Sequence, residues 1–320
     1  MKVLFIGFRF LEHSKYGGYD WITNLKNSTY LDVRKMPFGS HYQKHGGRIP
    51  LFLTYISCFF KSSKYDVVHF FYGDRCSFSR RWVAKKTKVV ATVHLKSENF
   101  PDKWVRKFKT YDSIICLSKS EEEKLREKKL PAHFIPHGFN RPVFITTELS
   151  SIDFDKNKLN VCFLGSNYRD YDTFIKIAEI MQEKRFDIVF HALGQSRNLK
   201  DKICNKKNIK VYPHLNDDLY YSLIQNCDYV FIPLLFATAN NALLEAQSLG
   251  IVSILPKIPG ILDYACEKEN IYYQDFENLE TIFLNLKKRQ KSTELIEFSK
   301  KYEWSNIYKK LEALYKELIK

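Results

Sequence analysis

Several patterns that define large classes of protein are missing from this sequence. Its 320 residues hold no apolar run near the roughly 20 residues that a membrane-spanning helix needs. The longest such run, "LFLTYISCFF" at 51–60, predicts part of a buried or interfacial helix instead. The opening residues, "MKVLFIGF", predict a strand and a turn, without a cleavable signal pattern.

Cysteine is scarce and its spacing is irregular. The seven cysteines are an odd number, and none form a CxxC pair. This argues against a zinc site or a disulfide framework and suits the reducing cytoplasm. A GxGxxG motif after the first strand is also missing, which argues against an NAD-dependent oxidoreductase. We therefore expect a cytoplasmic protein with neither a metal nor a cofactor.

Positive charge is concentrated in the first part of the chain. The net charge is +15, and residues 1–140 contain 26 Lys and Arg against 12 Asp and Glu, whereas 141–320 contain 25 against 24. A generally Lys-rich composition would not produce this asymmetry. The charge predicts an anionic partner, such as a membrane surface, a phospholipid-linked substrate or nucleic acid. The basic clusters at 80–88 and 103–109 include aromatic residues, which favours a bilayer interface.

Short apolar runs alternate with helical patterns through 1–140. Such alternation predicts a parallel sheet that is covered by helices on both faces. The predicted strands are 2–8, 66–72, 88–94, 112–118 and 133–137, and the predicted helices are 18–26, 50–62, 100–109 and 120–129.

The alternation stops at a polar segment, 141–158, which is typical of a linker, and then restarts. An amphipathic helix closes the chain at 301–320. We therefore expect an α/β fold with two doubly wound domains, 1–140 and 159–300. The second domain has predicted strands at 160–165, 187–194, 209–213, 229–235 and 251–256, and predicted helices at 171–184, 216–226 and 240–249.

The stretch "ATANNALLEAQ" follows a predicted strand and begins a helix. Ligands of open α/β sheets bind at such carboxyl ends, and the first turn of a helix attracts phosphate. Asn240 and Asn241 would add amide donors there, and Glu245, one turn further, could accept two hydrogen bonds from a ribose diol. Together they predict a nucleotide diphosphate site. The alternative is an asparagine cap and an exposed glutamate.

The segment "GSNYRD" occupies the equivalent turn after the first strand of the second domain. Gly165 and Ser166 would allow close backbone approach to a ligand, and Arg169 offers a fork of donors for phosphate oxygens. Asp170 either orients Arg169 or caps the following helix. This turn predicts a second part of the same donor site.

Candidates in the first domain are fewer. Gly17 and Gly18 follow the first strand and predict a loop that approaches phosphate or substrate. His94 ends a strand, where it could act as an acid or base or bind a hydroxyl. His137 and Gly138 end the last strand and either line a cleft or form a turn.

In order and spacing these motifs resemble the retaining GT-B glycosyltransferases of the family-4 type. The Gly-Gly loop, "ATVH", "FIPHGF", "LGSNYRD" and "ATANNALLEA" carry the resemblance, which covers nearly the whole chain. It implies two Rossmann-like domains that face a cleft, with the last helix packing back on the first domain. It also implies a nucleotide diphosphate sugar as donor.

The resemblance implies roles for particular residues. Glu245 would bind the donor ribose, Asn240 and Asn241 would lie near the diphosphate, Arg169 would contact phosphate, and His94 would lie near the reacting sugar. The chain departs from the family pattern in three places. The family often has an acid eight residues before Glu245, an Arg directly after the glycine at 165 and a Lys about six residues later. This sequence has Ala237, Ser166 and Asp172.

We therefore expect a glycosyltransferase that acts on a glycan or lipid-linked glycan, as in the biosynthesis of cell-surface polysaccharides. It would be peripheral on the inner face of the cytoplasmic membrane. One alternative is a non-catalytic GT-B scaffold, prompted by Ala237. Another is a basic nucleic-acid-binding protein, although no motif for nucleic-acid binding is visible.

Overall fold

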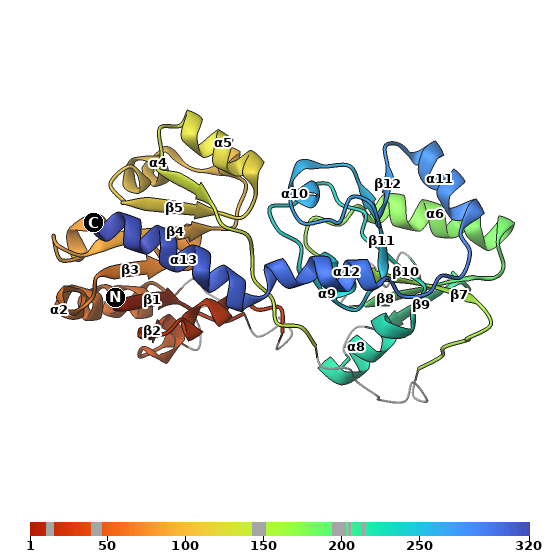
Figure 1. The fold of residues 1–320 in the computed structure, drawn as a ribbon, viewed down its shortest axis with the longest axis horizontal. Helices are drawn as coiled ribbons and strands as arrows, with labels where there is room; N and C mark the ends of the chain where they lie inside the picture. The colour runs from red at the N-terminus through yellow and green to blue at the C-terminus, as the bar shows by residue number, and fades with distance from the viewer. Residues whose placement is uncertain (11–15, 40–46, 143–151, 194–202, 204–205, 213–214) are drawn as a thin grey trace. The chain divides into compact units, whose positions relative to one another are not determined.

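The computed structural model describes residues 1–10, 16–39, 47–142, 152–193, 203, 206–212 and 215–320. It divides into two compact units, each a parallel sheet with helices on its faces (Figure 1). Unit 1 comprises Met1–Phe139 and Tyr302–Lys320, and unit 2 comprises Asn140–Lys301. Part of the predicted linker, 143–151, lies outside the described residues.

The sheet of unit 1 has the strand order β2-β1-β3-β4-β5-β6, and its neighbouring strands are all parallel. The order reverses beside β1, because β2 pairs on one side of it and β3 on the other. Helices cover both faces of the inner strands, which explains their nearly continuous apolar sequence. The strands are β1 (Val3–Gly7), β2 (Ser28–Asp32), β3 (Val67–Phe70), β4 (Lys88–Val93), β5 (Ser113–Cys116) and β6 (Ala132–Phe134).

The helices of unit 1 follow the predicted alternation with two differences, one of which is a short helix at Gly73–Cys76 that the sequence did not predict. The segment 18–26, predicted as a helix, forms only a short 3-10 turn, η1 (Tyr19–Asn24). A second such turn, η5 (Arg80–Trp82), precedes β4. The α-helices are α2 (Arg48–Lys61), α3 (Gly73–Cys76), α4 (Asp102–Phe108), α5 (Lys119–Glu127) and α13 (Trp304–Ile319).

The C-terminal helix α13 belongs to unit 1, as predicted. Its buried face consists of Trp304, Ile307, Leu311, Leu314 and Tyr315, which recur at the helical period. The chain enters this helix beside the end of the first segment, where the amide of Phe139 donates to the carbonyl of Tyr302 at 3.0 Å. The helix therefore completes the core of a unit whose other residues lie far away in the sequence.

A line of hydrogen bonds runs from α13 into the sheet of unit 1. The Tyr315 hydroxyl lies 2.5 Å from Nδ1 of His69, and Nε2 of His69 lies 2.8 Å from Oγ1 of Thr92. The same hydroxyl of Thr92 is 3.1 Å from the Tyr19 hydroxyl. His69 is buried, and burial lowers the pKa of its imidazole to about 3. The ring is therefore neutral at physiological pH.

His69 should make the stability of the protein depend on pH. The unfolded chain takes up the proton near pH 6.5, but the folded chain does so only near pH 3. The stabilisation is therefore present above pH 6.5 and is lost as the pH falls. From pH 7 to pH 5 we expect the wild type to lose about 2 kcal/mol more unfolding free energy than His69→Gln. Urea titrations of both proteins at the two pH values measure this, and equal losses would contradict it.

The sheet of unit 2 has the order β12-β11-β10-β7-β8-β9, again with parallel neighbours. Its core includes the stacked rings of Phe163 and Phe174, whose centroids are 4.0 Å apart. The strands are β7 (Leu159–Leu164), β8 (Ile188–Leu193), β9 (Ile209–Tyr212), β10 (Tyr229–Phe231), β11 (Val252–Pro256) and β12 (Ile271–Tyr273).

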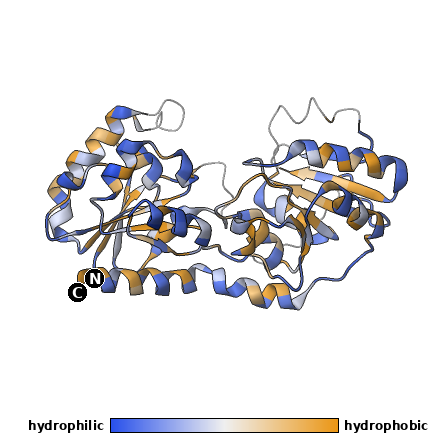
Figure 2. Ribbon diagram, turned by 90° about the horizontal axis from the view of Figure 1, so that it is seen from above, coloured by the Kyte–Doolittle hydropathy of each residue, from blue (hydrophilic) through white to orange (hydrophobic). Residues whose placement is uncertain are grey.

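The sequence predicted no element between 257 and 300, but β12 and three helices lie there. Hydrophobic residues concentrate in the strands and on single faces of most helices (Figure 2). The prediction of two doubly wound α/β domains is thus confirmed. The helices of unit 2 are α6 (Tyr171–Lys184), α8 (Asp217–Asn226), α9 (Asn241–Ser248), α10 (Pro259–Leu262), α11 (Phe276–Asn285) and α12 (Thr293–Ser299).

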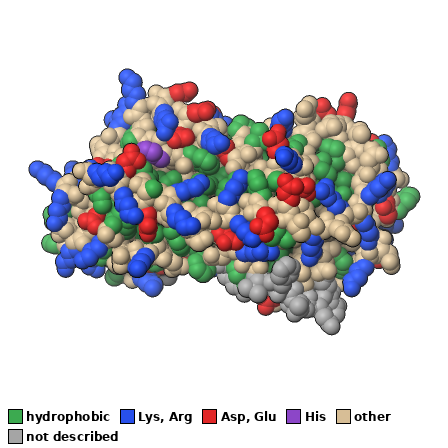
Figure 3. Space-filling model, viewed as in Figure 1, with side chains coloured by type: hydrophobic (Ala, Val, Ile, Leu, Met, Phe, Trp, Pro, Cys, Tyr) green, Lys and Arg blue, Asp and Glu red, His purple; other side chains and the backbone are tan. Residues whose placement is uncertain are grey.

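Two surface properties bear on possible partners. Among the described helices, none combines the length and the apolar character that spanning a bilayer requires. Lys and Arg side chains, blue in Figure 3, gather around the part of unit 1 that Figure 1 labels α2 and the N-terminus.

Candidate functional site

The two segments predicted to bind the donor lie side by side in unit 2. Strand order reverses between β7 and β10, and ligands of doubly wound sheets bind outside the carboxyl ends of strands at such a point. The amide of Asp170 donates to the carbonyl of Pro233 at 3.1 Å, and the amide of Leu235 donates to the carbonyl of Tyr168 at 3.0 Å. These bonds join the turn after β7 to the loop that leads into α9.

Arg169 is a nearly buried cation, with 8% of its surface exposed. Its Nε donates to the carbonyl of Leu164 at 2.6 Å, and its Nη1 donates to the carbonyl of Asn167 at 3.0 Å. Among the described residues, no carboxylate lies within ion-pair distance of this guanidinium. Burial lowers the pKa of Arg169 to about 10, so the group stays charged at neutral pH. A buried charge without a counter-ion is costly, and it attracts an anion.

Gly165 makes room for this arginine. Its φ of +77° lies in the left-handed region, and a Cβ there would lie 2.5 Å from Nη2 of Arg169. The glycine therefore serves both the sharp turn and the packing of the guanidinium. Ser166 is exposed, and its carbonyl accepts from the Tyr171 hydroxyl at 3.1 Å.

Asp170 takes only one of its two predicted roles. Its Oδ1 accepts from the amide of Thr173 at 3.0 Å, and its Oδ2 accepts from the hydroxyl of Thr173 at 2.7 Å. The carboxylate thus caps α6 instead of orienting Arg169, because a short side chain at the N-cap reaches the first turn of its own helix most readily.

Glu245 is buried, contrary to the alternative that it is an exposed helix residue. Its Oε1 accepts from the Tyr221 hydroxyl at 2.8 Å, and its Oε2 accepts from the Tyr220 hydroxyl at 2.9 Å. Both tyrosines come from α8, and sequence reasoning missed them because adjacent aromatics in a helix look like core residues. These two hydroxyls hold the carboxylate of α9 against α8.

Asn240 is the N-cap of α9, where its Oδ1 accepts from the amide of Leu243 at 3.0 Å. The capping alternative is therefore correct for this residue, and Asn241 is the first residue of the helix. Ala237 is buried, and a Cβ on Gly260 would lie 1.8 Å from the carbonyl oxygen of Ala237. The segment before α9 is thus tightly packed against α10.

Tyr168 is a further residue of this turn that the sequence did not predict. It is 50% exposed and has a φ of +55°, which is unusual for a residue with a side chain. Its ring centroid lies 5.4 Å from that of Phe236, in the loop after β10. An exposed aromatic held in a strained conformation beside a cation offers a flat surface for a ring of a ligand.

His94 follows β4 at the carboxyl edge of the unit 1 sheet. Its ring packs against Tyr72 at 4.5 Å and Tyr19 at 4.8 Å between centroids. Its Nδ1 lies 3.8 Å from Oδ1 of Asp74, whose other oxygen accepts from the amides of His94 and Leu95 at 3.3 and 3.1 Å. Sequence reasoning missed Asp74, because an Asp-Arg pair after a strand is usually a surface feature.

The other predicted residues of unit 1 divide into two groups. Gly17 and Gly18 are buried and lead into Tyr19, whose ring also lies 4.9 Å from that of His137. The structure thus brings His137 and the Gly-Gly loop close to His94. Gly138 has a structural role, since a Cβ there would lie 2.5 Å from the Trp304 indole.

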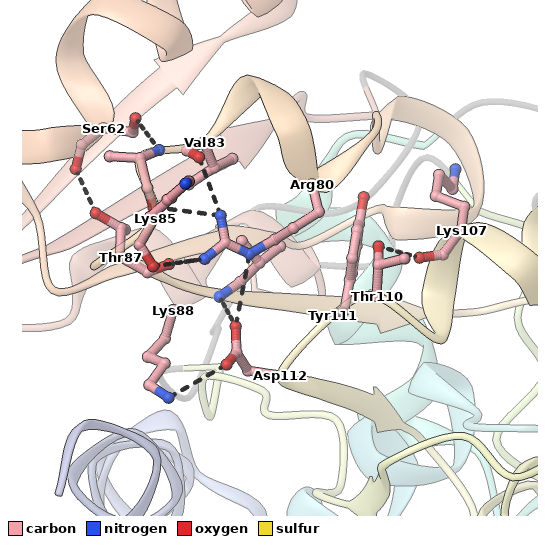
Figure 4. Close-up of polar contacts among 12 residues, drawn as sticks. Ser62, Arg80, Val83, Lys85, Thr87, Lys88, Lys107, Thr110, Tyr111 and Asp112 are labelled. Carbon is pink, nitrogen blue, oxygen red and sulfur yellow. Dashed lines mark hydrogen bonds and ion pairs between the residues drawn. The ribbon is translucent and has the colours of Figure 1, made fainter.

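Some basic side chains of the clusters at 80–88 and 103–109 make polar contacts within the fold (Figure 4). The Arg80 guanidinium donates to four carbonyls, those of Val83, Ala84, Lys85 and Thr87. It also lies 4.0 Å from Asp112, which pairs with Lys88 at 3.3 Å. Arg80 and Lys88 therefore stabilise a loop. This differs from the expectation that they lie at a bilayer interface.

Two residues of the second cluster also make contacts within the fold. Phe108 is fully buried. Lys107 donates from Nζ to the hydroxyl of Ser77 at 2.7 Å, and burial lowers its pKa to about 8. Lys103, Arg106 and Lys109 are exposed, so a membrane contact through this helix stays a prediction.

Two family models match consecutive parts of the chain. Residues 23–141 match Glycosyltransferase Family 4, and residues 158–285 match Glycosyl transferases group 1. A comparison with curated proteins gives no match.

Solved structures of the same architecture cover the chain. A glycosyltransferase from Rickettsia africae ESF-5 has a TM-score of 0.74 at 14% identity, over 100% of this chain and 99% of that one. Anabaena Alr3699/HepE in complex with UDP has a TM-score of 0.72 at 12% identity, over 99% and 100%. The sucrose-phosphate synthase of Thermosynechococcus elongatus has a TM-score of 0.63 at 16% identity, over 85% and 80%. These likenesses agree with the two family models, and the chain belongs to the family-4-type GT-B glycosyltransferases.

Proposed function

We propose that this protein transfers a sugar, with retention, from a nucleotide diphosphate sugar to a glycan or lipid-linked glycan. The observation that carries the proposal is the buried Arg169, which has no acidic counter-ion among the described residues. It lies at the strand-order reversal of unit 2, beside the loop that leads to α9. A diphosphate would supply the missing negative charge.

The surrounding groups match the other parts of such a donor. The first turn of α9 offers amide donors and a partial positive charge to the diphosphate. The Glu245 carboxylate, held by two tyrosine hydroxyls, would accept from a ribose diol. Tyr168 and Phe236 offer aromatic surface for a base or a sugar. The Anabaena protein was solved with UDP and with UDP-glucose, so uridine nucleotides are the first donors to test.

In the proposed reaction, the bond between the donor sugar and its phosphate breaks, and a bond to an acceptor hydroxyl forms. The negative charge that develops on the departing diphosphate is stabilised by Arg169 and by the N–H groups of α9. These groups supply positive charge without a metal ion. Relatives often carry an acid at the position of Ala237. Because that acid is replaced here, other groups must recognise the donor sugar.

We place the enzyme at the inner face of the cytoplasmic membrane as a peripheral protein. The excess of basic residues in 1–140 supports this, because lipid-linked acceptors carry phosphate in an anionic leaflet.

Asp74 is proposed to position His94 for the transfer step. We expect Asp74→Asn to lower kcat about tenfold and leave UDP affinity unchanged, because the change loosens the backbone and ring of His94 while the donor groups lie in unit 2. Steady-state kinetics and UDP titration measure both. The double variant, Asp74→Asn with His94→Ala, should have a kcat close to that of His94→Ala alone. Fully additive losses would contradict a shared role.

A thermal-shift panel of nucleotide diphosphate sugars tests the proposed function, followed by a transfer assay with the donor that binds. Binding should raise the melting temperature. Binding and transfer together support the enzyme. Binding without transfer to any tested acceptor would favour the non-catalytic scaffold that Ala237 suggests. A panel in which no nucleotide binds would overturn the proposal.

A further inference from the structure

Helix α2 presents a row of large apolar side chains to solvent. Ile49, Phe52, Phe59 and Phe60 are 56%, 52%, 53% and 72% exposed. At 100° per residue these four side chains fall within one arc of about 100°. The sequence predicted a buried or interfacial helix here, and this outward row favours the interfacial alternative.

The inward face of α2 is the less hydrophobic one. Its buried residues are Pro50, Thr54 and Cys58, and the Thr54 hydroxyl donates to the carbonyl of Pro50 at 2.7 Å. A helix that only covers a sheet would bury its phenylalanines and expose its threonine. The reversed arrangement indicates that the outward face has a partner.

The loop around η5 extends this face. The Phe59 ring lies 6.0 Å from the Trp82 ring. The amide of Ala84 donates to the Ser62 hydroxyl at 3.0 Å, and the Thr87 hydroxyl donates to the Ser62 carbonyl at 2.9 Å. These contacts fix the loop beside the end of α2. We call α2 together with residues 81–86 the α2 surface.

Charge identifies the partner of the α2 surface. Residues 48–65 and 77–88 contain no Asp or Glu. Basic side chains therefore outnumber acidic ones around the apolar row, where Asp66 shares a pocket with Lys64 and Lys86. The exposed basic side chains are Arg48, Lys61, Lys64, Arg81, Lys85 and Lys86.

We infer that the α2 surface is the element that docks the protein on an anionic lipid bilayer. The apolar row would enter the boundary between headgroups and acyl chains, and the flanking cations would meet lipid phosphates. The aromatic rings suit that boundary, where Trp and Phe side chains are favoured. This inference rests on the proposed function for the membrane location only, and it moves the contact from the cluster at 103–109 to α2.

Cosedimentation of the whole chain with vesicles tests the inference. Two compositions are needed: phosphatidylcholine alone, and phosphatidylglycerol with phosphatidylcholine in equal parts. We expect binding to the anionic vesicles, release by about 0.5 M salt, and far weaker binding to the neutral vesicles. Neither mixture contains an acceptor, so binding reports the surface alone.

Two variants separate the apolar and the ionic contributions. Phe52→Ser with Phe60→Ser should lower the partition coefficient at least about tenfold, because two exposed rings no longer insert. Lys85→Glu with Lys86→Glu should lower the partition coefficient on anionic vesicles at least as much. High salt should remove this difference from the wild type. All four side chains are exposed, so the fold should tolerate the changes.

Matched controls lie in unit 2. Phe186 is 78% exposed, and Lys268 and Lys287 are exposed cations. Phe186→Ser, and Lys268→Glu with Lys287→Glu, should bind vesicles as the wild type does. Equal losses in the controls, or wild-type binding by the α2 variants, would overturn the inference.

Two further outcomes are informative. If the wild type ignores anionic vesicles but forms a dimer that Phe52→Ser with Phe60→Ser dissociates in analytical ultracentrifugation, the α2 surface binds a second copy and the inference is wrong. A UDP thermal shift on the same samples tests the proposed function separately, since the α2 surface lies in unit 1 and Arg169 in unit 2.

Discussion

Arg169→Met is expected to abolish most donor binding while the protein stays folded. The arginine supplies a buried, fixed positive charge at the proposed diphosphate site, and hydrogen bonds to charged groups are among the stronger ones in proteins. We expect the affinity for UDP to fall about a hundredfold, which corresponds to roughly 3 kcal/mol. Methionine fills a similar volume, and removing an uncompensated buried charge relieves a desolvation cost. The melting temperature without ligand should therefore change little.

Isothermal titration with UDP and melting curves of the unliganded proteins measure both effects. Arg169→Lys should give an intermediate loss, because it keeps the charge but lacks the two-pronged donor. Arg289→Met is the matched control, since Arg289 lies in the same unit but pairs with Glu269 at 2.9 Å. Arg169→Met that binds UDP as tightly as the wild type would remove Arg169 from the donor site.

Trp304→Ala is expected to destabilise unit 1 strongly and leave the donor site intact. The indole is 2% exposed and packs against Gly138 and Tyr19. Truncating a buried tryptophan removes its apolar burial and leaves a cavity, at a cost of about 3–5 kcal/mol. Because Arg169 and Glu245 belong to unit 2, the UDP affinity at low temperature should remain within about twofold of the wild type.

Chemical denaturation followed by tryptophan fluorescence and by circular dichroism measures this cost, with UDP titration on the same samples. Tyr308→Phe, which removes one hydrogen bond from the same helix to the carbonyl of Trp21, is the milder comparison. A loss of UDP binding that matches the loss of stability would mean that the units do not respond separately.

The fold was largely predictable because both sheets are parallel and buried. Strands such as "KVVATV" and "LNVCFL" are nearly continuous apolar runs, and this is the pattern that burial on both faces requires. Two of the elements between 257 and 300, β12 and α10, were missed because they are short. The strand β12 has three residues, Ile271–Tyr273, and the helix α10 has four, too few for a clear period.

The site was predictable where one segment carries the chemistry. The turn with Gly165 and Arg169, and the start of α9, were both identified from local patterns. Their partners were not, because they come from distant parts of the chain. Tyr221 reaches Glu245 from 24 positions away, and Asp74 reaches the backbone of His94 from 20. Only the packing of the elements makes such pairs visible.

Helix caps show the same limit on a smaller scale. The sequence "SKSEEE" contains two serines, and we expected Ser120 to begin the helix. Ser118 is the N-cap of α5 instead, and its hydroxyl accepts from the amide of Glu121. Both serines have an acidic residue three positions later, so the pattern alone does not choose between them.

The place of α13 in unit 1 has a consequence for biosynthesis. Unit 2 is one continuous stretch of chain, whereas unit 1 consists of Met1–Phe139 and the last residues, Tyr302–Lys320. During translation, the core of unit 1 therefore stays incomplete until the rest of the protein has been made. Only then can Trp304 and Tyr315 pack against the first segment. Unit 2 can finish folding earlier although it is made later. We expect nascent chains stalled before residue 302 to expose apolar surface of unit 1 and to recruit chaperones, and release of the final helix to end that exposure.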